Sequence, residues 1–326
     1  MSMCKVQRLL MVACCAATVV ALCQPSFAVV YSGGTGHTIA PSGSGGKPND
    51  PGFANIGEMS IGSGIHLQDG WILTAYHVYQ YQHGGSGTGK AQIQFESSQT
   101  TYYEIEGTFT RIKYNNTTNA DLGVFRVAGD TGLGVLTIRS DTPSQNTDVT
   151  MIGAGRDRDA SSILWYVDTD PTEWDWREED FPEANGEFTG FKTSSNHTKR
   201  WGTNEVHSAT NTILSGTFGT TSAFSTRFDS GAGDNECQVV GGDSGGGVFA
   251  YNSSSSEWEL AGLMLALGLF NNQPAHTAVY DNLTYSGDLS LYRDQIIDAL
   301  PEPATISLLV IGSLLVLVRR KRRLKI

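Results

Sequence analysis

The feature that most constrains the fold is a series of short apolar or alternating stretches, rich in β-branched and aromatic residues and separated by Gly, Asn and Asp. They lie at residues 61–67, 71–75, 91–95, 102–112, 122–127, 149–153, 239–240, 247–251, 258–265 and 277–280. Long helical periodicity is absent between them. Short strands at turn-like spacing predict an all-β barrel or sandwich.

Two segments flank this pattern. Residues 29–55 are rich in Gly, Ser and Pro, which predicts an irregular N-terminal arm on the surface of a single domain at 56–300. Residues 289–300 predict one amphipathic helix, with Asp288 as its N-cap and apolar side chains on one face.

The body of the chain is strongly acidic. Residues 29–300 carry 14 Lys and Arg against 32 Asp and Glu, a net charge of −18. Phosphate contacts need clustered basic residues, so we expect no nucleic-acid partner. The most acidic stretch, 168–187, is predicted to be a solvated surface loop; a calcium site using Asp168 and Asp170 is a weaker alternative, because no spaced ligand motif supports it.

The N-terminal 28 residues have the parts of a secretory signal peptide. Lys5 and Arg8 precede an apolar run at 9–22, and a small-x-small site ends at Ala28. A retained membrane anchor is the alternative, but the run is shorter than the roughly 20 residues that span a bilayer. The mature chain is therefore expected to begin at Val29.

The C-terminal residues 301–326 contain Pro-Glu-Pro, an apolar run at 304–318 and then Arg-Arg-Lys-Arg-Arg. Basic residues after an apolar run hold that end in the cytoplasm. This order resembles the PEP-CTERM sorting signal of Gram-negative bacteria, and an ordinary C-terminal anchor is the alternative. The resemblance implies transient insertion in the inner membrane, removal by a sorting protease, and delivery to the cell surface, outer membrane or extracellular matrix.

Removal of the leader would leave Cys237 as the only cysteine, so the mature protein can have no internal disulfide. Core packing and sheet hydrogen bonds must then provide the stability that disulfides often supply in exported proteins. Cys237 could serve as a nucleophile, but a buried thiol is the simpler interpretation.

The segment GGDSGGG at 241–247 places Ser244 between glycines, whose backbone can approach a reacting carbonyl closely. A Gly-rich turn is the alternative. A serine nucleophile needs a base, usually a histidine, and a carboxylate that orients it. His77 suits the first role, because it follows a predicted hairpin with Asp69-Gly70 at its turn.

Asp121 suits the second role, because it leads directly into a strand that is expected to be buried. A charged group beside an apolar strand needs a partner, and an imidazolium would supply one. Taken alone, however, this residue is explained at least as well by a turn aspartate that caps the start of the strand.

Together the segments TAYH at 74–77, NADL at 119–122 and GDSGG at 242–246 resemble the trypsin-like (chymotrypsin-fold) serine protease family, in its order His, Asp, Ser. The resemblance implies two six-stranded antiparallel β-barrels with the active site in the cleft between them, and a short C-terminal helix. It implies His77, Asp121 and Ser244 as the triad, the N–H groups of Gly242 and Ser244 as the oxyanion hole, peptide or protein substrates and no cofactor or metal.

Two further residues are assigned through the same resemblance. Gln238 stands where trypsins carry the aspartate that reads Arg and Lys, so we expect a different substrate preference. Asp243 stands where the family pairs an acid with a new chain start, which makes Val29 its candidate partner. The functional alternatives are a surface binding protein that retains a protease fold, and an esterase or lipase, whose nucleophile elbow has a different context.

Overall fold

The computed structural model describes residues 29–42, 50–85, 89–96 and 100–300. The expected signal peptide, the sorting signal and its apolar run at 304–318 lie outside these residues. Within the described part, no helix combines the length and the apolar character needed to cross a membrane.

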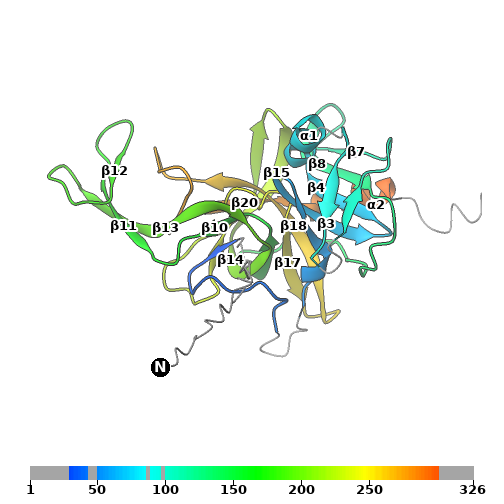
Figure 1. Cartoon of the computed structure of the whole chain (residues 1–326), viewed down its shortest axis with the longest axis horizontal. Helices are drawn as coiled ribbons and strands as arrows, with labels where there is room; N and C mark the ends of the chain where they lie inside the picture. The colour runs from blue at the N-terminus through cyan, green and yellow to red at the C-terminus, as the bar shows by residue number, and fades with distance from the viewer. Residues whose placement is uncertain (1–28, 43–49, 86–88, 97–99, 301–326) are drawn as a thin grey trace, which may run out of the picture.

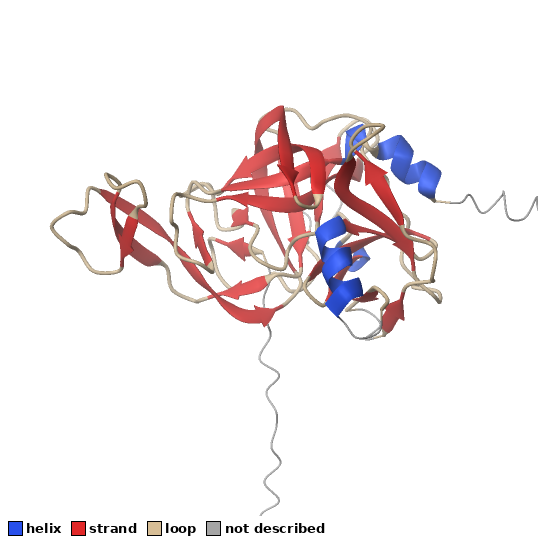
Figure 2. Cartoon of the chain, turned by 90° about the horizontal axis from the view of Figure 1, so that it is seen from above, coloured by secondary structure: helices blue, strands red, loops and turns tan. Residues whose placement is uncertain are grey.

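Nearly half of the described residues lie in antiparallel strands, as the strand pattern predicted (Figures 1 and 2). The first half is a curved seven-stranded sheet in the order β6-β5-β2-β3-β4-β8-β7. Its strands are β2 (Ile56–Met59), β3 (Gly62–Gln68), β4 (Trp71–Ala75), β5 (Gln92–Gln94), β6 (Thr101–Tyr103), β7 (Thr110–Lys113) and β8 (Asn119–Arg126).

This first sheet differs from the expected closed six-stranded barrel. The predicted strand at 102–112 is divided into β6 and β7, and Gly107 between them has a φ of 79°. Just beyond β6, Glu104 forms a single bridge with Val127 just beyond β8. This bridge joins the end strand β6 to β8, the strand beside the other end, and no continuous ladder closes the described sheet, which is therefore a half-barrel.

The second half is a closed six-stranded barrel in the order β14-β15-β20-β18-β17-β9. Its strands are β9 (Asp148–Gly153), β14 (Arg200–Gly216), β15 (Gly219–Arg227), β17 (Gly247–Asn252), β18 (Glu257–Gly268) and β20 (Leu283–Asp288). Phe249 and Leu263 of this barrel belong to the same buried cluster as Ile65 and Phe125 of the first sheet. The two halves therefore share a continuous apolar core.

Two short helices accompany the strands (Figure 2). The predicted C-terminal helix is present as a 3-10 turn, η2 (Leu289–Leu291), followed by α2 (Arg293–Ala299), and Asp288 accepts a hydrogen bond from Ser290 N–H at the start. Helix α1 (Tyr76–Gly85) was not predicted. Its sequence has little apolar periodicity, and it is held instead by buried Val78 and Tyr79 and by Gln82, whose side chain bonds the backbone of Gln92.

The N-terminal arm is mostly irregular, as predicted, but its first residues do not lie on the surface. β1 (Val30–Tyr31) pairs with β16 (Cys237–Gln238), and Val29 and Val30 are buried. Farther along, the arm is fixed by the His37 ring, which stacks between Tyr31 and Trp201 at centroid distances of 4.0 and 3.9 Å. The arm ends at η1 (Phe53–Asn55), which leads into β2. The start of the arm is thus part of the interior.

The acidic stretch at 168–187 was wrongly predicted as a loop alone. It belongs to a β-finger that extends away from the two halves (Figures 1 and 2). The finger consists of β11 (Ile163–Asp168), β12 (Asp175–Arg177) and β13 (Gly186–His197), with β10 (Arg156–Arg158) and β19 (Thr277–Val279) pairing on β13 at its base.

Aromatic side chains explain why this acidic segment folds. Trp174 and Trp176 alternate with charged residues, and with Phe188 and Phe270 they cover the buried Trp165. The carboxylates can then stay in water while the other face is apolar. No group of three His, Cys, Asp or Glu in the described residues could hold a metal ion, and Asp168 accepts a hydrogen bond from Asp170 N–H.

Candidate active site

His77 lies in the first turn of α1, directly after β4. The β3–β4 hairpin delivers it there, and its predicted turn is confirmed, since Asp69 and Gly70 have φ values of 48° and 79°. The His77 backbone N–H donates to Asp121 Oδ1 at 2.9 Å. The helix start is therefore tied to the neighbouring strand by the same carboxylate that meets the ring.

Asp121 lies in β8 and its Oδ2 is 2.7 Å from His77 Nδ1. The side chains are only 17% and 16% exposed, so water screens the pair poorly. A carboxylate accepting from Nδ1–H leaves Nε2 of the neutral ring free to take a proton. The Asp121 backbone N–H in turn donates to Thr221 Oγ1 of β15 at 2.9 Å, which ties the backbone of Asp121 to the second barrel.

Ser244 lies on a loop before β17 that is bonded to the strands leading to His77. The Ser244 carbonyl accepts from Ser63 N–H at 2.8 Å, and the Ser63 carbonyl accepts from Thr74 Oγ1 at 2.7 Å. Within the described residues no hydrogen bond joins Ser244 Oγ to the His77 ring. Catalytic hydrogen bonds are often long without substrate and shorten in its presence.

Gly245 permits this close approach. It has a φ of 88°, and a Cβ there would lie 2.1 Å from the Ser63 carbonyl oxygen. Gly245→Ala should therefore lower the free energy of unfolding by about 3 kcal/mol and displace the loop, which a denaturant titration would measure. Gly134→Ala is the control, because nothing lies within 4 Å of a Cβ at Gly134. Equal stability of the two variants would contradict the tight-loop interpretation.

The same loop presents two backbone donors. Asp243 N–H bonds the Val240 carbonyl and Gly246 N–H bonds the Asp243 carbonyl, whereas the N–H groups of Gly242 and Ser244 donate to no described residue. Gly242 has a φ of 97°, a conformation that favours glycine. Two unpaired donors on one tight turn are suited to an oxyanion.

Asp243 is fully buried behind the loop. Its Oδ1 accepts from Gly155 N–H at 2.8 Å and from Val29 N–H at 3.3 Å, and its Oδ2 accepts from Val240 N–H at 2.8 Å. Burial raises the pKa of Asp243 to about 7, although these hydrogen bonds act in the opposite direction. The two residues assigned as a pair from the sequence, Val29 and Asp243, are in contact.

Gln238 lies in β16 and is fully buried. Its Nε2 donates to Asn282 Oδ1 at 3.2 Å, and Asn282 is in turn bonded to Gln273 through both amide groups. Gln238 Oε1 has no hydrogen-bond partner among the described residues. The next residue, Cys237, is also buried, and burial raises the pKa of its thiol, so it does not fit the role of nucleophile.

Residues 62–263 match the family model of the trypsin-like peptidase domain, which is more than half of the 326-residue chain and includes all three triad segments. The chain belongs to the trypsin-like peptidase family. The matched region contains strands of both halves, so the family assignment applies to the domain as a whole and identifies the protein as a protease.

Solved structures with this fold are distant in sequence. The Rv3671c protease of M. tuberculosis in its inactive form is 12% identical with a TM-score of 0.38, and the alignment covers 76% of this chain and 90% of that chain. A mutant of human heparin binding protein is 14% identical with a TM-score of 0.47, covering 79% and 96%. No curated protein matches the chain.

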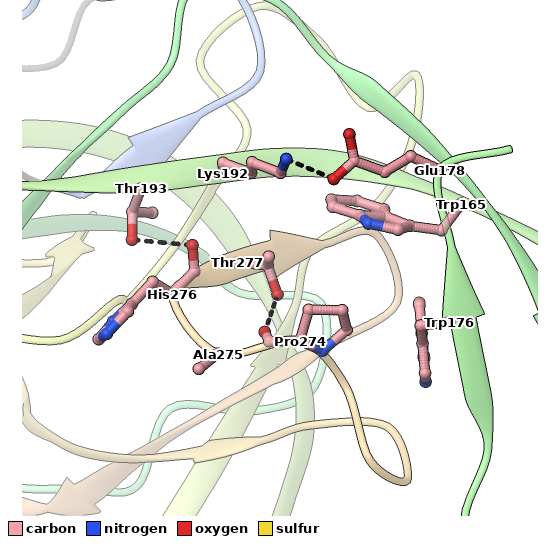
Figure 3. A pocket seen from close by; sticks show the side chains of 9 residues that line it. All are labelled: Trp165, Trp176, Glu178, Lys192, Thr193, Pro274, Ala275, His276 and Thr277. Atoms are coloured by element: carbon pink, nitrogen blue, oxygen red, sulfur yellow. Dashed lines mark hydrogen bonds and ion pairs between the residues drawn. The ribbon is translucent and has the colours of Figure 1, made fainter.

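A pocket of about 310 Å³ lies at the base of the finger and contains none of the triad residues (Figure 3). Trp165 and Trp176 form one side of it, and Lys192 is paired with Glu178 at its edge. Thr193 Oγ1 donates to the His276 carbonyl at 3.1 Å. This hydrogen bond joins β13 to the β18–β19 loop, whereas the Lys192–Glu178 pair lies within the finger.

Sequence reasoning missed the residues that support the triad. Thr221 holds the backbone of Asp121, and Ser63 and Thr74 hold the nucleophile loop. Thr74 lies in the first motif segment, but no local motif marks Thr221 or Ser63. Their role follows only from the packing of β15 against β8 and the pairing of β3 with β4.

Proposed function

We propose that this protein is an exported serine endopeptidase with Ser244 as nucleophile, His77 as general base and Asp121 as the residue that orients His77. The observation that carries this proposal is the 2.7 Å contact between His77 Nδ1 and Asp121 Oδ2 beside the Ser244 loop. It supports the triad because it leaves the opposite ring nitrogen available to a serine.

In the proposed reaction, Ser244 Oγ forms a bond to the scissile carbonyl carbon as its proton passes to His77 Nε2. The oxygen that gains charge is held by the N–H groups of Gly242 and Ser244, of which a single donor is commonly worth about 2.7 to 4 kcal/mol. His77 then gives its proton to the leaving amine, the C–N bond breaks, and water hydrolyses the acyl-enzyme by the same route.

The proposed substrate preference excludes Arg and Lys at the residue before the scissile bond. This proposal rests on the family resemblance, which puts the neutral Gln238 in place of the aspartate that binds Arg and Lys, because a desolvated cation without a carboxylate partner is costly. Gln238 itself is fully buried and bonded to Asn282. In a mixed peptide library we expect less than about a tenth of the cleavages to follow Arg or Lys. A majority of cleavages after basic residues, identified by mass spectrometry of the products, would contradict this assignment.

Export is proposed to deliver and activate the enzyme. The leader at 1–28 would direct secretion, and its removal would create a chain start at Val29, whose backbone nitrogen already faces Asp243. The tail at 301–326 would hold the protein in the inner membrane until a sorting protease released it to the cell surface or matrix. N-terminal sequencing of exported material should give Val29 as the first residue.

The test of the activity itself is hydrolysis of an unlabelled protein substrate by the exported chain, before and after treatment with a fluorophosphonate. We expect steady proteolysis that the reagent abolishes, because it phosphonylates an activated serine. Proteolysis that persists after treatment and stops with a chelator or a thiol reagent would point to a different mechanism.

A further inference from the structure

A pocket of about 370 Å³ lies directly beside the paired His77 and Asp121. Its remaining walls are mostly apolar and come from the second barrel: Leu214 and Phe218 from the β14–β15 hairpin, and Leu265 and Ala266 from β18. The volume is at the lower end of the range for small-molecule sites, enough for a large side chain. The catalytic pair therefore forms one wall of an open apolar pocket.

The tip of the β14–β15 hairpin lies outside the three motif segments and takes no part in the proposed reaction. Figure 1 shows β15 rising beside α1, although the two belong to different halves of the fold. Phe218 lies at the tip, with its ring 5.5 Å from the His77 ring and 5.8 Å from the Tyr81 ring. The tip is thus seated across the junction of the two halves.

Arg111 of β7 fastens the tip in place. Its Nη2 donates to the Phe218 carbonyl, and its Nε donates to the Ala120 carbonyl at 3.3 Å. The guanidinium also lies 3.5 Å from the centre of the Tyr76 ring. One side chain therefore contacts the residue before His77, the residue before Asp121 and the hairpin tip.

A further contact makes the hairpin position specific. A Cβ at Gly219 would lie 2.3 Å from the Asn119 carbonyl oxygen, so the backbone of β15 touches the start of β8. Thr221, two residues on, accepts the hydrogen bond from Asp121 N–H. Moving the hairpin away would therefore break a bond to the backbone of Asp121.

We propose that the β14–β15 hairpin forms an apolar subsite for a substrate side chain next to the scissile bond, with Phe218 as its specificity-determining residue and Arg111 as the residue that positions it. The proposal rests on the proposed peptidase function. A substrate apolar side chain that fills this pocket loses contact with water and also shields the His77–Asp121 pair from it. Peptides with Gly at that position lack this contact.

The test compares peptides that differ only in having Leu or Gly at each of the two positions on either side of the scissile bond. With the processed wild-type chain, one position should show a kcat/KM at least about tenfold higher for Leu than for Gly. Phe218→Ala should reduce that ratio about tenfold, and Phe218→Leu should restore most of it. Arg111→Lys should reduce the ratio as well, because an ammonium cannot bond both carbonyls in the same geometry.

Ile213→Ala is the matched control, since Ile213 lies on the same hairpin, is 47% exposed and does not line the pocket. Its ratio should stay within about twofold of the wild type. An unchanged ratio in Phe218→Ala, or no position with a preference for Leu, would overturn the subsite. Fluorophosphonate labelling of each variant tests the subsite and the peptidase function separately. Protein that is labelled but shows no preference for Leu over Gly would contradict the subsite and support the peptidase function. Protein that is not labelled would contradict both.

Discussion

Ser244→Ala should lower kcat/KM for any peptide substrate by about 10⁴- to 10⁶-fold, the largest effect that we expect from a single substitution. The reason is chemical, because no other described hydroxyl occupies the turn between Gly242 and Gly245 where the two unpaired N–H donors lie. The measurement is the initial rate of peptide hydrolysis by purified variant at high enzyme concentration.

The fold should survive this change. Ser244 bonds Ser63 N–H through its backbone carbonyl, which alanine retains. The unfolding midpoint of Ser244→Ala should therefore lie within a few degrees of the wild type. His77→Ala should give a similar loss of activity, and the double variant should lose little more than either single variant, because the residues act as a unit. Activity that survives in Ser244→Ala would contradict the assigned nucleophile.

A short peptide extension before Val29 should lower kcat/KM by about 10²- to 10³-fold relative to a chain that begins at Val29. Val29 is fully buried and its nitrogen lies 3.3 Å from Asp243 Oδ1, so a free chain start would place an ammonium group against that carboxylate. An extended chain has an uncharged amide at this nitrogen in place of the ammonium group. A chain of the same length with the extension after Leu300 is the control.

The pH dependence of stability should distinguish the two forms. In the unprocessed chain the pKa of Asp243 is raised from 3.8 to about 7, so ionisation of this carboxyl opposes folding. Stability therefore falls as the pH rises from about 4 to about 7 and levels off above that range. An ammonium at Val29 favours the carboxylate, which should remove this fall in the processed chain. The difference in unfolding temperature between the forms should therefore grow from about pH 4 to about pH 7.

Asp243→Asn supplies the counter-test. With no ionisable group at this position, the difference between extended and processed chains should no longer depend on pH in this range, and the processed form should lose most of its activity. Equal activity of extended and Val29-initiated wild-type chains would contradict activation by processing, while leaving the triad untouched.

Local patterns were sufficient for most of the strands and for the three motif segments. Asp69-Gly70 sets its own turn conformation, and the apolar run at 122–127 marks a buried strand without knowledge of its neighbours. Both features are encoded in a few adjacent residues. The contact between Val29 and Asp243 was expected only through the family resemblance.

The features that were missed depend on contacts between distant segments. Helix α1 is stabilised by packing and by the bonds of Gln82 to Gln92, which its own periodicity does not indicate. The finger at 163–197 folds because Trp174 and Trp176 meet Phe270 from a loop about a hundred residues later. The contact of Phe218 with His77 likewise requires the register of β14 with β15.

Treating the processed chain with a fluorophosphonate and locating the adduct by peptide mass spectrometry tests whether Ser244 is the nucleophile. We expect one stoichiometric adduct, on Ser244, which is absent in His77→Ala because the serine is no longer activated. A folded wild-type chain that carries no adduct would indicate a binding protein with a protease fold, and an adduct on any other residue would contradict the assigned nucleophile.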